Sequence, residues 1–492
     1  MTDISTPEAS IHTAAPPSMG RNARWLATAQ LAKTLVQLVG LGVLSRLLSP
    51  ADFGVMALAT IVTNLAGLLR DMGTGPAIIR SRALTPTMVN SIFWLNVISG
   101  SVIALVIVLF SIPLARLFNS VSLSAVLCWL ALTFPVMSLG AAHQALLERD
   151  SRFRTVARSD VLSYSCGMSS AVIAAYFGLG VKSLVIQAIV HSSLSSLQMF
   201  MASPWRPSWQ CDIKEIRRIF GFSSNLTLSN LVIYLNRNAD SMIVGKLLGA
   251  VALGPNSLAF KIKLYPLKSI ALVASKALYP VMSAHQTDPV ALRGKYLQSV
   301  SFVALITAPL MGGLMALRVP FVAVALGAKW SGVAALLLWL APVGFVQSVL
   351  STAPAVFMVK GRTDWLLMLN FGMAMVHILC WLIGAHFGGL HGMAAAYLVA
   401  TLISAPVYLA LTAKLLDLRL SVLLGALQWQ VVLGAGVFLA AYGVSRTLDL
   451  FALATLPHLL LAAALGAAYG LWHIHRFNPE QMSVLRRALH FT

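Results

Sequence analysis

Acidic side chains are scarce in this sequence. Its 492 residues include 15 Asp and Glu against 35 Lys and Arg, and charged residues make up 10% of the chain. A soluble domain carries about 25% charged residues, whereas hydrophobic residues here reach 58%. The composition therefore excludes an ordinary soluble protein and indicates a chain that lies mostly in lipid.

Cysteine is also sparse. The four cysteines show none of the spacings of a disulfide framework or a metal site, and the eleven histidines are equally scattered. No glycine-rich loop that could cradle a phosphate occurs, so ATP is not expected as the driver. We expect no metal, no cofactor and no catalytic residues.

We expect no secretory signal peptide at the start of the given sequence. Residues 1–24 are polar, contain Pro7, Pro16 and Pro17, and hold no short apolar core before a small-residue cleavage site. We expect them to form a disordered cytoplasmic tail.

Long apolar runs make up most of the remainder. Fourteen stretches of about 20 residues recur between Trp25 and His473, each able to cross a hydrocarbon core of about 30 Å. They begin near residues 25, 53, 88, 121, 160, 182, 219, 251, 294, 331, 364, 391, 422 and 451. Lipid admits only helices or closed barrels, and these runs do not alternate as barrel strands do. The sequence predicts an all-α polytopic membrane protein with about 14 transmembrane helices.

The net charge of +20 has a topological explanation that does not involve nucleic acid. With the N-terminus inside, 23 of the 35 Lys and Arg residues fall on the cytoplasmic side and seven outside. This asymmetry follows the positive-inside rule and predicts two cytoplasmic termini. The remaining basic residues fall within the spans: Lys33, Arg237, Lys261, Lys263 and Lys268.

The sequence contains an internal repeat. "RLLSPADFGVMALA" (46–59) aligns without gaps with "KLLGAVALGPNSLA" (246–259), and Arg152 aligns with Arg362 further along. Such repeats predict two related six-helix lobes, here in the same orientation because six is even, with a pseudo-twofold axis along the membrane normal and a cavity between them. The last two stretches, which begin near residues 422 and 451, have no counterpart in the repeat and form an added pair.

The repeat sets the expected domain boundaries. We expect a tail at 1–24, an N-lobe at 25–202, a cytoplasmic linker at 203–218, a C-lobe at 219–413, two added helices at 414–475 and a cytoplasmic tail at 476–492. The aligned segments are 200 residues apart, so the first span predicts that the seventh helix covers about 225–248. Arg237 and Asp240 are then expected to fall inside the bilayer.

Polar residues share one face on the first and seventh spans. At 100° per residue, these faces carry Gln30, Lys33, Thr34 and Gln37 on the first span and Asn230, Tyr234, Arg237 and Ser241 on the seventh. Contacts with neighbouring helices would explain the uncharged members equally well. A charge at mid-bilayer costs about 2.5–3.5 kcal/mol, so Lys33 and Arg237 favour a wet, substrate-binding cavity.

The stretch "LAFKIKLYPLKS" (258–269) places three lysines in the eighth span. Lys261, Tyr265 and Lys268 lie within about 60° of one another on a helix, and Lys263 points the opposite way. Lys268 is near enough to the cytoplasmic end to extend into water. Lys261 is near the middle and is the strongest candidate to bind an anion such as a pyrophosphate.

Asp240 is the clearest carboxylate within a span. It follows Arg237 by one turn, so an ion pair between the two is one interpretation, and a site that couples transport to a proton or a cation is the other. Asp71 and Asp160 lie near span ends, where we expect them to face the cytoplasm.

Three blocks of sequence resemble a known family. "LSRLLSPADFG" (44–54), "LLRDMGTGPAIIRSRALT" (68–85) and "RNADSMIVGKLLGAVALGPNSLAFKIKLYP" (237–266) are similar to the bacterial polysaccharide transporter family, the Wzx-type oligosaccharide flippases. The resemblance covers about 25–415 and is strongest to exporters of repeat units such as those of colanic acid, amylovoran or xanthan. Pro255 stands where that family usually has an aromatic residue, whereas the Lys261 position is commonly basic there.

The resemblance implies the fold of the multidrug/oligosaccharidyl-lipid/polysaccharide exporter superfamily. It also implies an oligosaccharide on undecaprenyl pyrophosphate as substrate, moved to the periplasmic leaflet of the bacterial inner membrane for exopolysaccharide or O-antigen-type biosynthesis. Partners would be the polysaccharide polymerase and export machinery, and the added helices would suit a lipid-tail groove, as in related peptidoglycan-precursor flippases.

Other functions stay open at this point. A multidrug exporter of the same fold usually uses intramembrane carboxylates in its first lobe, and spans 1–6 show none at mid-depth. A lipid II flippase would share the pyrophosphate. A polymerase generally needs a large outer loop, which is missing. A scaffold would translocate nothing.

Overall fold

The computed structural model describes residues 19–71, 74–80, 84–209, 211–212, 231, 234, 238–266, 272–450 and 454–477. All regular secondary structure within these ranges is helical. The chain divides into two compact units, one made of Met1–Leu47, Ala59–Arg116 and Val121–Tyr234, the other of Leu48–Leu58, Leu117–Ser120 and Leu235–Thr492. The all-helical fold class expected from the sequence is confirmed for the described residues.

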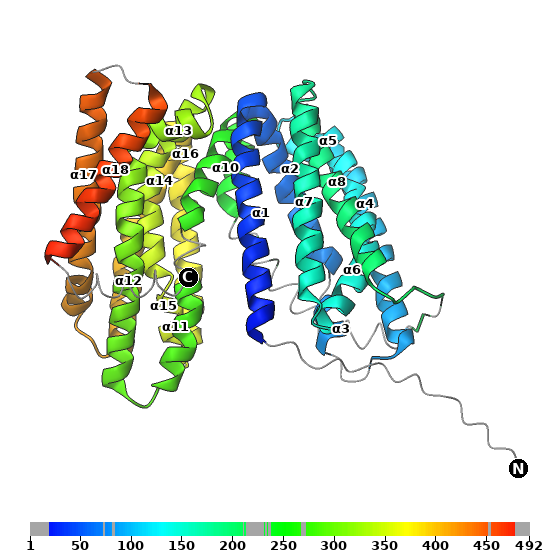
Figure 1. The fold of residues 1–492 in the computed structure, drawn as a ribbon, viewed down its shortest axis with the longest axis horizontal. Helices are drawn as coiled ribbons and strands as arrows, with labels where there is room; N and C mark the ends of the chain where they lie inside the picture. The colour runs from blue at the N-terminus through cyan, green and yellow to red at the C-terminus, as the bar shows by residue number, and fades with distance from the viewer. Residues whose placement is uncertain are drawn as a thin grey trace, which may run out of the picture. The chain divides into compact units, whose positions relative to one another are not determined.

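The first unit contains most of the early helices (Figure 1). They are α1 (Met19–Leu47), α2 (Pro50–Asp71, whose first residues belong to the second unit), α3 (Thr74–Arg80), α4 (Pro86–Leu117), α5 (Val121–Ala131), α6 (Thr133–Arg149), α7 (Phe153–Tyr176) and α8 (Lys182–Ala202). Helix α7 packs between α1 and α8, and α8 also packs on α6.

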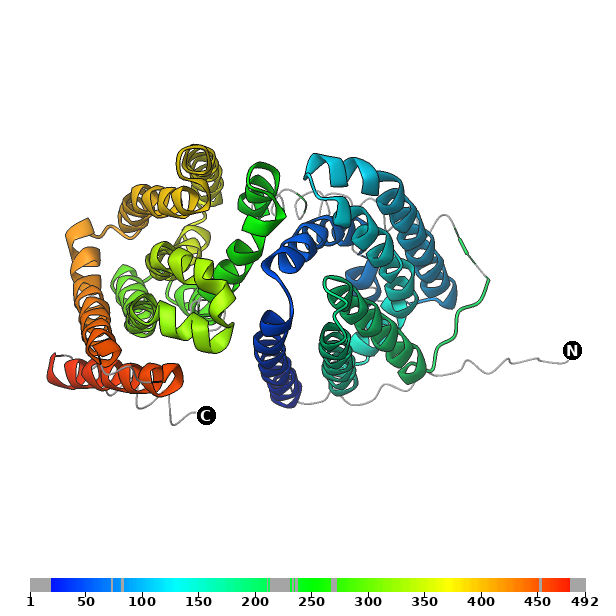
Figure 2. The same cartoon turned by 90° about the horizontal axis from the view of Figure 1, so that it is seen from above.

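The second unit contains the later helices. They are α10 (Gly249–Pro266), α11 (Leu272–Ala284), α12 (Pro289–Ala316), α13 (Arg318–Ala325), the short 3₁₀ helix η2 (Ala328–Trp330), α14 (Ser331–Leu350), α15 (Ala353–Val359), α16 (Thr363–Leu415), α17 (Leu420–Leu450) and α18 (Thr455–Phe477). Residues 238–247 are also helical. Helices α17 and α18 pack on each other at the edge of this unit, where both also contact α12 (Figure 2).

Nine helical stretches in the described part are long and apolar enough to cross a membrane. Together with the relatives described below, they establish a multi-pass membrane protein. The number fourteen, the two six-helix lobes and the expected domain boundaries stay predictions. Part of the expected seventh span lies outside the described residues.

Helix α16 is two helices joined by a kink. Its 53 residues would extend about 80 Å at 1.5 Å per residue, far more than a hydrocarbon core of about 30 Å. Gly388 and Gly389 break the helical backbone, and Gly389 has φ = 55°, a conformation that favours glycine. The two expected spans that begin near 364 and 391 correspond to the two parts of α16.

The repeated segments contact each other directly within the second unit. A Cβ on Gly54 would lie 1.7 Å from the carbonyl oxygen of Ala250, and a Cβ on Gly254 would lie 2.0 Å from that of Pro50. Gly54 and Gly254 are partners in the repeat, as are Pro50 and Ala250. The contact is therefore reciprocal, as a local twofold relation between α2 and α10 requires.

The start of α2 is fixed by a capping box. The Ser49 hydroxyl accepts a bond from the Asp52 backbone N–H at 3.2 Å, and the Asp52 carboxylate accepts from the Ser49 backbone N–H at 2.9 Å. This reciprocal arrangement satisfies two backbone donors that a helix start leaves open. It holds the α2 end that meets α10 in one orientation.

Candidate functional site

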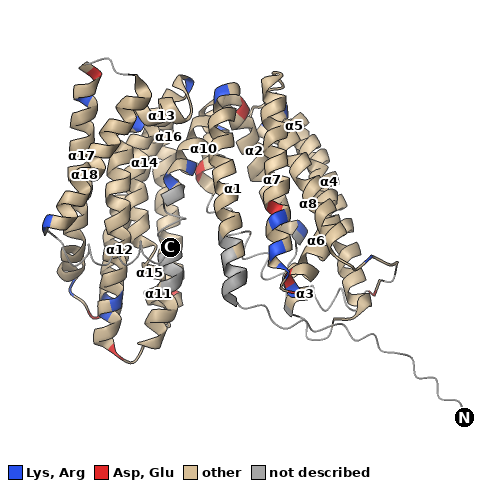
Figure 3. Ribbon diagram, viewed as in Figure 1, with Lys and Arg blue, Asp and Glu red and all other residues tan. Residues whose placement is uncertain are grey.

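Charged residues are few along the helices and lie mostly toward helix ends (Figure 3). Two clusters of charge on the helices concern residues singled out by the sequence. One is a lysine on α1 in the first unit, and the other is a lysine on α10 in the second. Each is near a carboxylate from another helix, so we describe the two clusters in turn.

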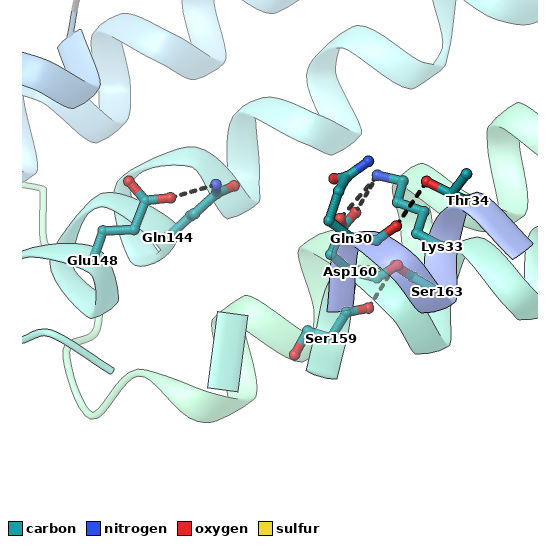
Figure 4. Close-up of polar contacts among 8 residues, drawn as sticks. All are labelled: Gln30, Lys33, Thr34, Gln144, Glu148, Ser159, Asp160 and Ser163. Carbon is teal, nitrogen blue, oxygen red and sulfur yellow. Dashed lines mark hydrogen bonds and ion pairs between the residues drawn. The ribbon is translucent and has the colours of Figure 1, made fainter. Parts of the chain in front are cut away.

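Lys33 of α1 is paired with Asp160 of α7 (Figure 4). Its Nζ donates to Oδ1 at 2.9 Å and to Oδ2 at 2.8 Å. The side chains are partly buried, with 27% and 42% of their surface exposed. The expectation that Asp160 faces the cytoplasm stays a prediction, and the structure adds that a lysine from a helix 127 residues earlier reaches its carboxylate.

Aromatic rings complete this first cluster. The Lys33 ammonium lies 5.2 Å from the centre of the Tyr164 ring, and His191 of α8 packs edge-on against that ring at 5.7 Å. The buried His191 Nδ1 finds no hydrogen-bond partner in the described structure. The positive charge expected at Lys33 is therefore largely neutralised locally by Asp160.

The other polar residues expected on the first and seventh spans have separate positions. Gln30 is exposed and Gln37 is half-buried, while the Thr34 hydroxyl donates to the Gln30 carbonyl within α1 at 2.8 Å. The Tyr234 hydroxyl donates to the Ile61 carbonyl of α2 at 3.0 Å. Asn230 and Arg237 lie outside the described residues, and so does the predicted Arg237–Asp240 pair.

The lysines of α10 point in opposite directions. Lys261 is exposed, whereas Lys263 is 1% exposed. This is the arrangement that 100° per residue requires. Tyr265 lies in the last turn of α10, but its side chain and the whole of Lys268 lie outside the described part.

Lys263 occupies an aromatic cage. Its Nζ lies 4.3 Å from the ring centre of Phe260 and 4.6 Å from that of Tyr397 on α16, and it donates to the Tyr397 hydroxyl at 3.4 Å. Gln347 of α14 donates to the same hydroxyl at 2.6 Å. Aromatic faces attract a cation most strongly when water is excluded, so this cage suits a lysine in its ammonium form.

Asp240 provides the negative charge of the second cluster. It is 4% exposed and interacts electrostatically with Lys263. The hydroxyl of Ser241 donates to its carboxylate at 3.3 Å. A buried carboxylate is tolerated when a counter-charge accompanies it, and here the lysine on α10 supplies that counter-charge.

More residues of α14 and α16 surround the cage. His377 and Trp381 pack on the Tyr397 ring at 5.3 and 5.2 Å. A Cβ on Gly344 of α14 would lie 3.0 Å from Lys263 Cγ, so glycine gives the lysine room. Sequence reasoning missed Gln347, His377 and Tyr397, which lie 84 or more residues beyond Lys263 and share no motif with it.

An apolar groove lies elsewhere in the second unit. It has a volume of about 700 Å³ and is formed by α12, α13, α17 and α18. Leu310, Phe321, Ala463, Ala467 and Leu471 are among its lining residues.

No group of three His, Cys, Asp or Glu side chains suited to a metal occurs in the described residues.

Comparison with known proteins gives a consistent result. The family model described as "Polysaccharide biosynthesis protein" matches residues 43–335. The chain is 24% identical to the teichuronic acid biosynthesis protein TuaB of Bacillus subtilis, over 94% of this chain and 97% of that one. It is 25% identical to the lipopolysaccharide biosynthesis protein WzxC of Escherichia coli, over 78% of each chain.

A solved structure resembles the fold. The lipid II flippase MurJ in an inward closed conformation superposes with a TM-score of 0.72 at 13% identity, covering 93% of this chain and 99% of that one. At this identity the likeness concerns the fold alone.

Proposed function

Because the chain belongs to the polysaccharide biosynthesis protein family, we propose that it is a flippase for lipid-linked oligosaccharides. Its substrate would be an oligosaccharide repeat unit on undecaprenyl pyrophosphate, moved to the periplasmic leaflet of the bacterial inner membrane by alternating access. Both termini would be cytoplasmic. The relatives TuaB and WzxC, named for teichuronic acid and lipopolysaccharide biosynthesis, support this substrate class.

The observation that carries the proposal is that the second unit offers binding features for both parts of such a lipid. Lys261 presents an exposed ammonium on α10, and the groove of α12, α13, α17 and α18 presents an apolar surface. A polyprenyl pyrophosphate sugar needs a cation for its head group and an apolar surface for its tail. A polar, sugar-bearing head group would remain in hydrated space.

The head group would be bound by electrostatic attraction. Two unit charges 4 Å apart attract by about 4 kcal/mol at an effective dielectric of 20, so a pyrophosphate gains from several cations. Lys261, Arg237 and Lys268 are the proposed contacts, with Tyr265 and Tyr234 beside them. From the first span, Gln30, Gln37 and Lys33 are proposed to line the same cavity with Asn230, and Lys33 would have to leave Asp160 to bind the anion.

No chemistry is required of such a protein, because translocation forms and breaks no covalent bond. The driving force would be an ion gradient or the membrane potential. Asp240 is the proposed coupling site, since it is a buried carboxylate in a helix of the second unit. Polymerase and export machinery would use the product.

Two alternatives differ in their ligands. A drug exporter of this fold would bind organic cations, and Asp160 and Asp240 are each already accompanied by a lysine, which disfavours that function. A lipid II flippase would bind the same pyrophosphate and differ in the sugar. Competition between lipid II and an oligosaccharide lipid for the purified protein separates these two.

The experiment that tests the proposal uses vesicles and a labelled lipid-linked oligosaccharide. Lys261→Gln should slow translocation by at least about tenfold, the equivalent of 1.4 kcal/mol, and Lys261→Arg should retain most of it. Lys295→Gln, an exposed lysine of α12, is the matched control and should leave the rate unchanged. Full translocation by Lys261→Gln would exclude Lys261 as a head-group contact.

A further inference from the structure

We propose that Arg154 and Arg158 of α7, together with Trp25 of α1, form a binding site for the phosphate head group of an anionic phospholipid of the surrounding membrane. The site lies in the first unit and uses none of the residues proposed to bind the transported lipid. Because lipid binding alone tests it, this inference does not depend on the proposed flippase function.

Two guanidinium groups share one tryptophan ring in the first unit. The Cζ atoms of Arg154 and Arg158 lie 4.8 and 5.6 Å from the centre of the Trp25 ring. The two arginines are four residues apart, so they lie on the same face of α7, and both are exposed. The ring therefore holds two positive charges close together where α1 packs on α7.

Neither arginine has a counter-charge among the described residues. Asp160 is the only carboxylate of α7, and both of its oxygens accept from Lys33, at 2.9 and 2.8 Å. No ion pair within the described ranges includes Arg154 or Arg158. Two adjacent positive charges without a carboxylate attract an anion from the surroundings.

The arginines just before α7 have a different role. Arg149 donates to the Ile78 carbonyl at 2.8 Å, and Arg152 donates to the Ala202 carbonyl at 3.1 Å. These two side chains therefore connect parts of the first unit to each other. Asp150 lies between them, is exposed and forms no ion pair in the described part of the chain.

The second unit contains a similar arrangement that includes its own anion. Arg362 and Lys414 both lie by the ring of Trp365, with Cζ and Nζ at 4.2 and 5.6 Å from its centre. There the Asp364 carboxylate lies 3.4 Å from the Arg362 Nε. In the first unit, an external phosphate would take the place that Asp364 has in the second.

Arginine on a tryptophan ring is well suited to bind a phosphate. The attraction to the ring uses the face of the planar guanidinium. The N–H groups lie in its plane and stay available to donate two parallel bonds to phosphate oxygens. Contact with Trp25 also reduces the side-chain freedom that Arg154 and Arg158 would lose on binding a head group.

The position of the site along its helices favours a phospholipid over a free phosphate. With 29 and 24 residues, α1 and α7 extend about 43 and 36 Å, so their ends pass beyond a hydrocarbon core of about 30 Å. Trp25, Arg154 and Arg158 lie within about 9 Å of the helix starts, at the level of the lipid head groups, where tryptophan is enriched. The sequence predicts this end to be cytoplasmic, and the cytoplasmic leaflet carries anionic lipids.

The first test measures lipid binding to the purified full-length protein by native mass spectrometry. Phosphatidylglycerol and phosphatidylcholine with identical acyl chains are the probes. The wild type should prefer phosphatidylglycerol, and Arg154→Gln/Arg158→Gln should bind it about tenfold more weakly. Arg362→Gln/Lys414→Gln, which removes the same charge from Trp365, should keep the wild-type affinity. A wild type without this preference, or an equal loss in both double variants, would overturn the proposal.

The second test uses the wild type alone and decides the question even if the glutamine variants do not fold. Phosphatidylglycerol with a photoreactive head group is cross-linked to the protein in vesicles. Peptides that contain Trp25, Arg154 or Arg158 should carry the label, and unlabelled phosphatidylglycerol should remove it. Absence of label from these peptides would contradict the proposal. So would its removal by inorganic pyrophosphate or a lipid-linked oligosaccharide at lower concentrations than phosphatidylglycerol requires, because the site would then serve a free phosphate or the transported lipid.

Discussion

At the scale of single residues, the described lysines of the predicted spans differ in how far they are exposed. Lys33 and Lys263 are each accompanied by a carboxylate from another helix, Asp160 and Asp240. Lys261 differs in being exposed. In a chain with only 15 acidic residues, two accompany lysines of the predicted spans, so the charge of these two lysines is compensated within the protein.

The Lys33–Asp160 pair should stabilise the first unit by holding α1 on α7. Reversing either charge alone, as Lys33→Asp or Asp160→Lys, should cost about 1–3 kcal/mol, between the values for exposed and fully buried pairs. The double reversal should recover most of this loss, because attraction is restored. Thermal unfolding of the detergent-solubilised protein measures the effect.

An exposed pair provides the control for that experiment. Arg362 and Asp364 lie 3.4 Å apart with 44% and 61% of their side chains exposed, so reversing both should change stability by less than about 1 kcal/mol. If the Lys33–Asp160 double reversal is no more stable than the single variants, the pair does not hold the two helices together.

Helical periodicity predicted the relative directions of residues but not which side is buried. It placed Lys263 opposite Lys261, as the structure has it. The sequence of α10 carries a lysine on each of two opposite sides, so nothing distinguished the core-facing side from the exposed one. The contact between Asp160 and Lys33 could not be predicted, because the two residues are 127 positions apart in the chain and such a contact depends on tertiary packing.

At the scale of helices, the contact between α2 and α10 depends on two glycines. The sequence repeat predicted that Gly54 and Gly254 are equivalent, and the structure adds that each lies against the other copy. Alignment of a repeat reveals equivalence and says nothing of proximity, so this contact could not be predicted. Small residues at helix crossings allow the close backbone approach that stabilises helix pairs in lipid.

Gly54→Ala and Gly254→Ala should each destabilise the protein. The new methyl group would lie within 2.0 Å of a backbone oxygen, and such overpacking costs about 1–3 kcal/mol. Gly67→Ala, also in α2, has nothing within 4 Å of the added Cβ and should be neutral or stabilising by up to about 1 kcal/mol. Equal unfolding temperatures for all three variants would show that the close contact contributes nothing.

The groove of α12, α13, α17 and α18 permits a test of the lipid tail. Ala463→Trp or Ala467→Trp would fill part of it, and displacing two methylene groups, each worth about 0.8 kcal/mol, should weaken lipid binding about tenfold. Ala464→Trp, exposed on α18 and outside the groove, is the control. Substrates with shortened prenyl chains should be unaffected by the filled groove. Equal weakening for short and long chains would argue against tail binding there.

At the scale of the whole molecule, the sequence predicted the all-helical membrane fold well, because hydrophobic length is read directly from composition. It also anticipated the break in α16 as two spans, which Gly388 and Gly389 separate. The residues around Lys263 were harder to predict, because Tyr397 and Gln347 come from helices whose packing on α10 no sequence pattern encodes. Fold follows from local hydrophobicity, whereas the cage around Lys263 follows from tertiary contacts.

The distribution of basic residues makes a prediction about topology that labelling can test. Cytoplasmic loops attract Lys and Arg, so the loop after α11, which contains the exposed Thr287, should be cytoplasmic, and the residues before α18, including Ala454, should be periplasmic. In a protein freed of its four cysteines, Thr287→Cys should resist a membrane-impermeant maleimide in intact cells and react after lysis, while Ala454→Cys should react in both. The opposite pattern would invert the orientation, and with it the direction in which Lys261 could receive a lipid-linked sugar.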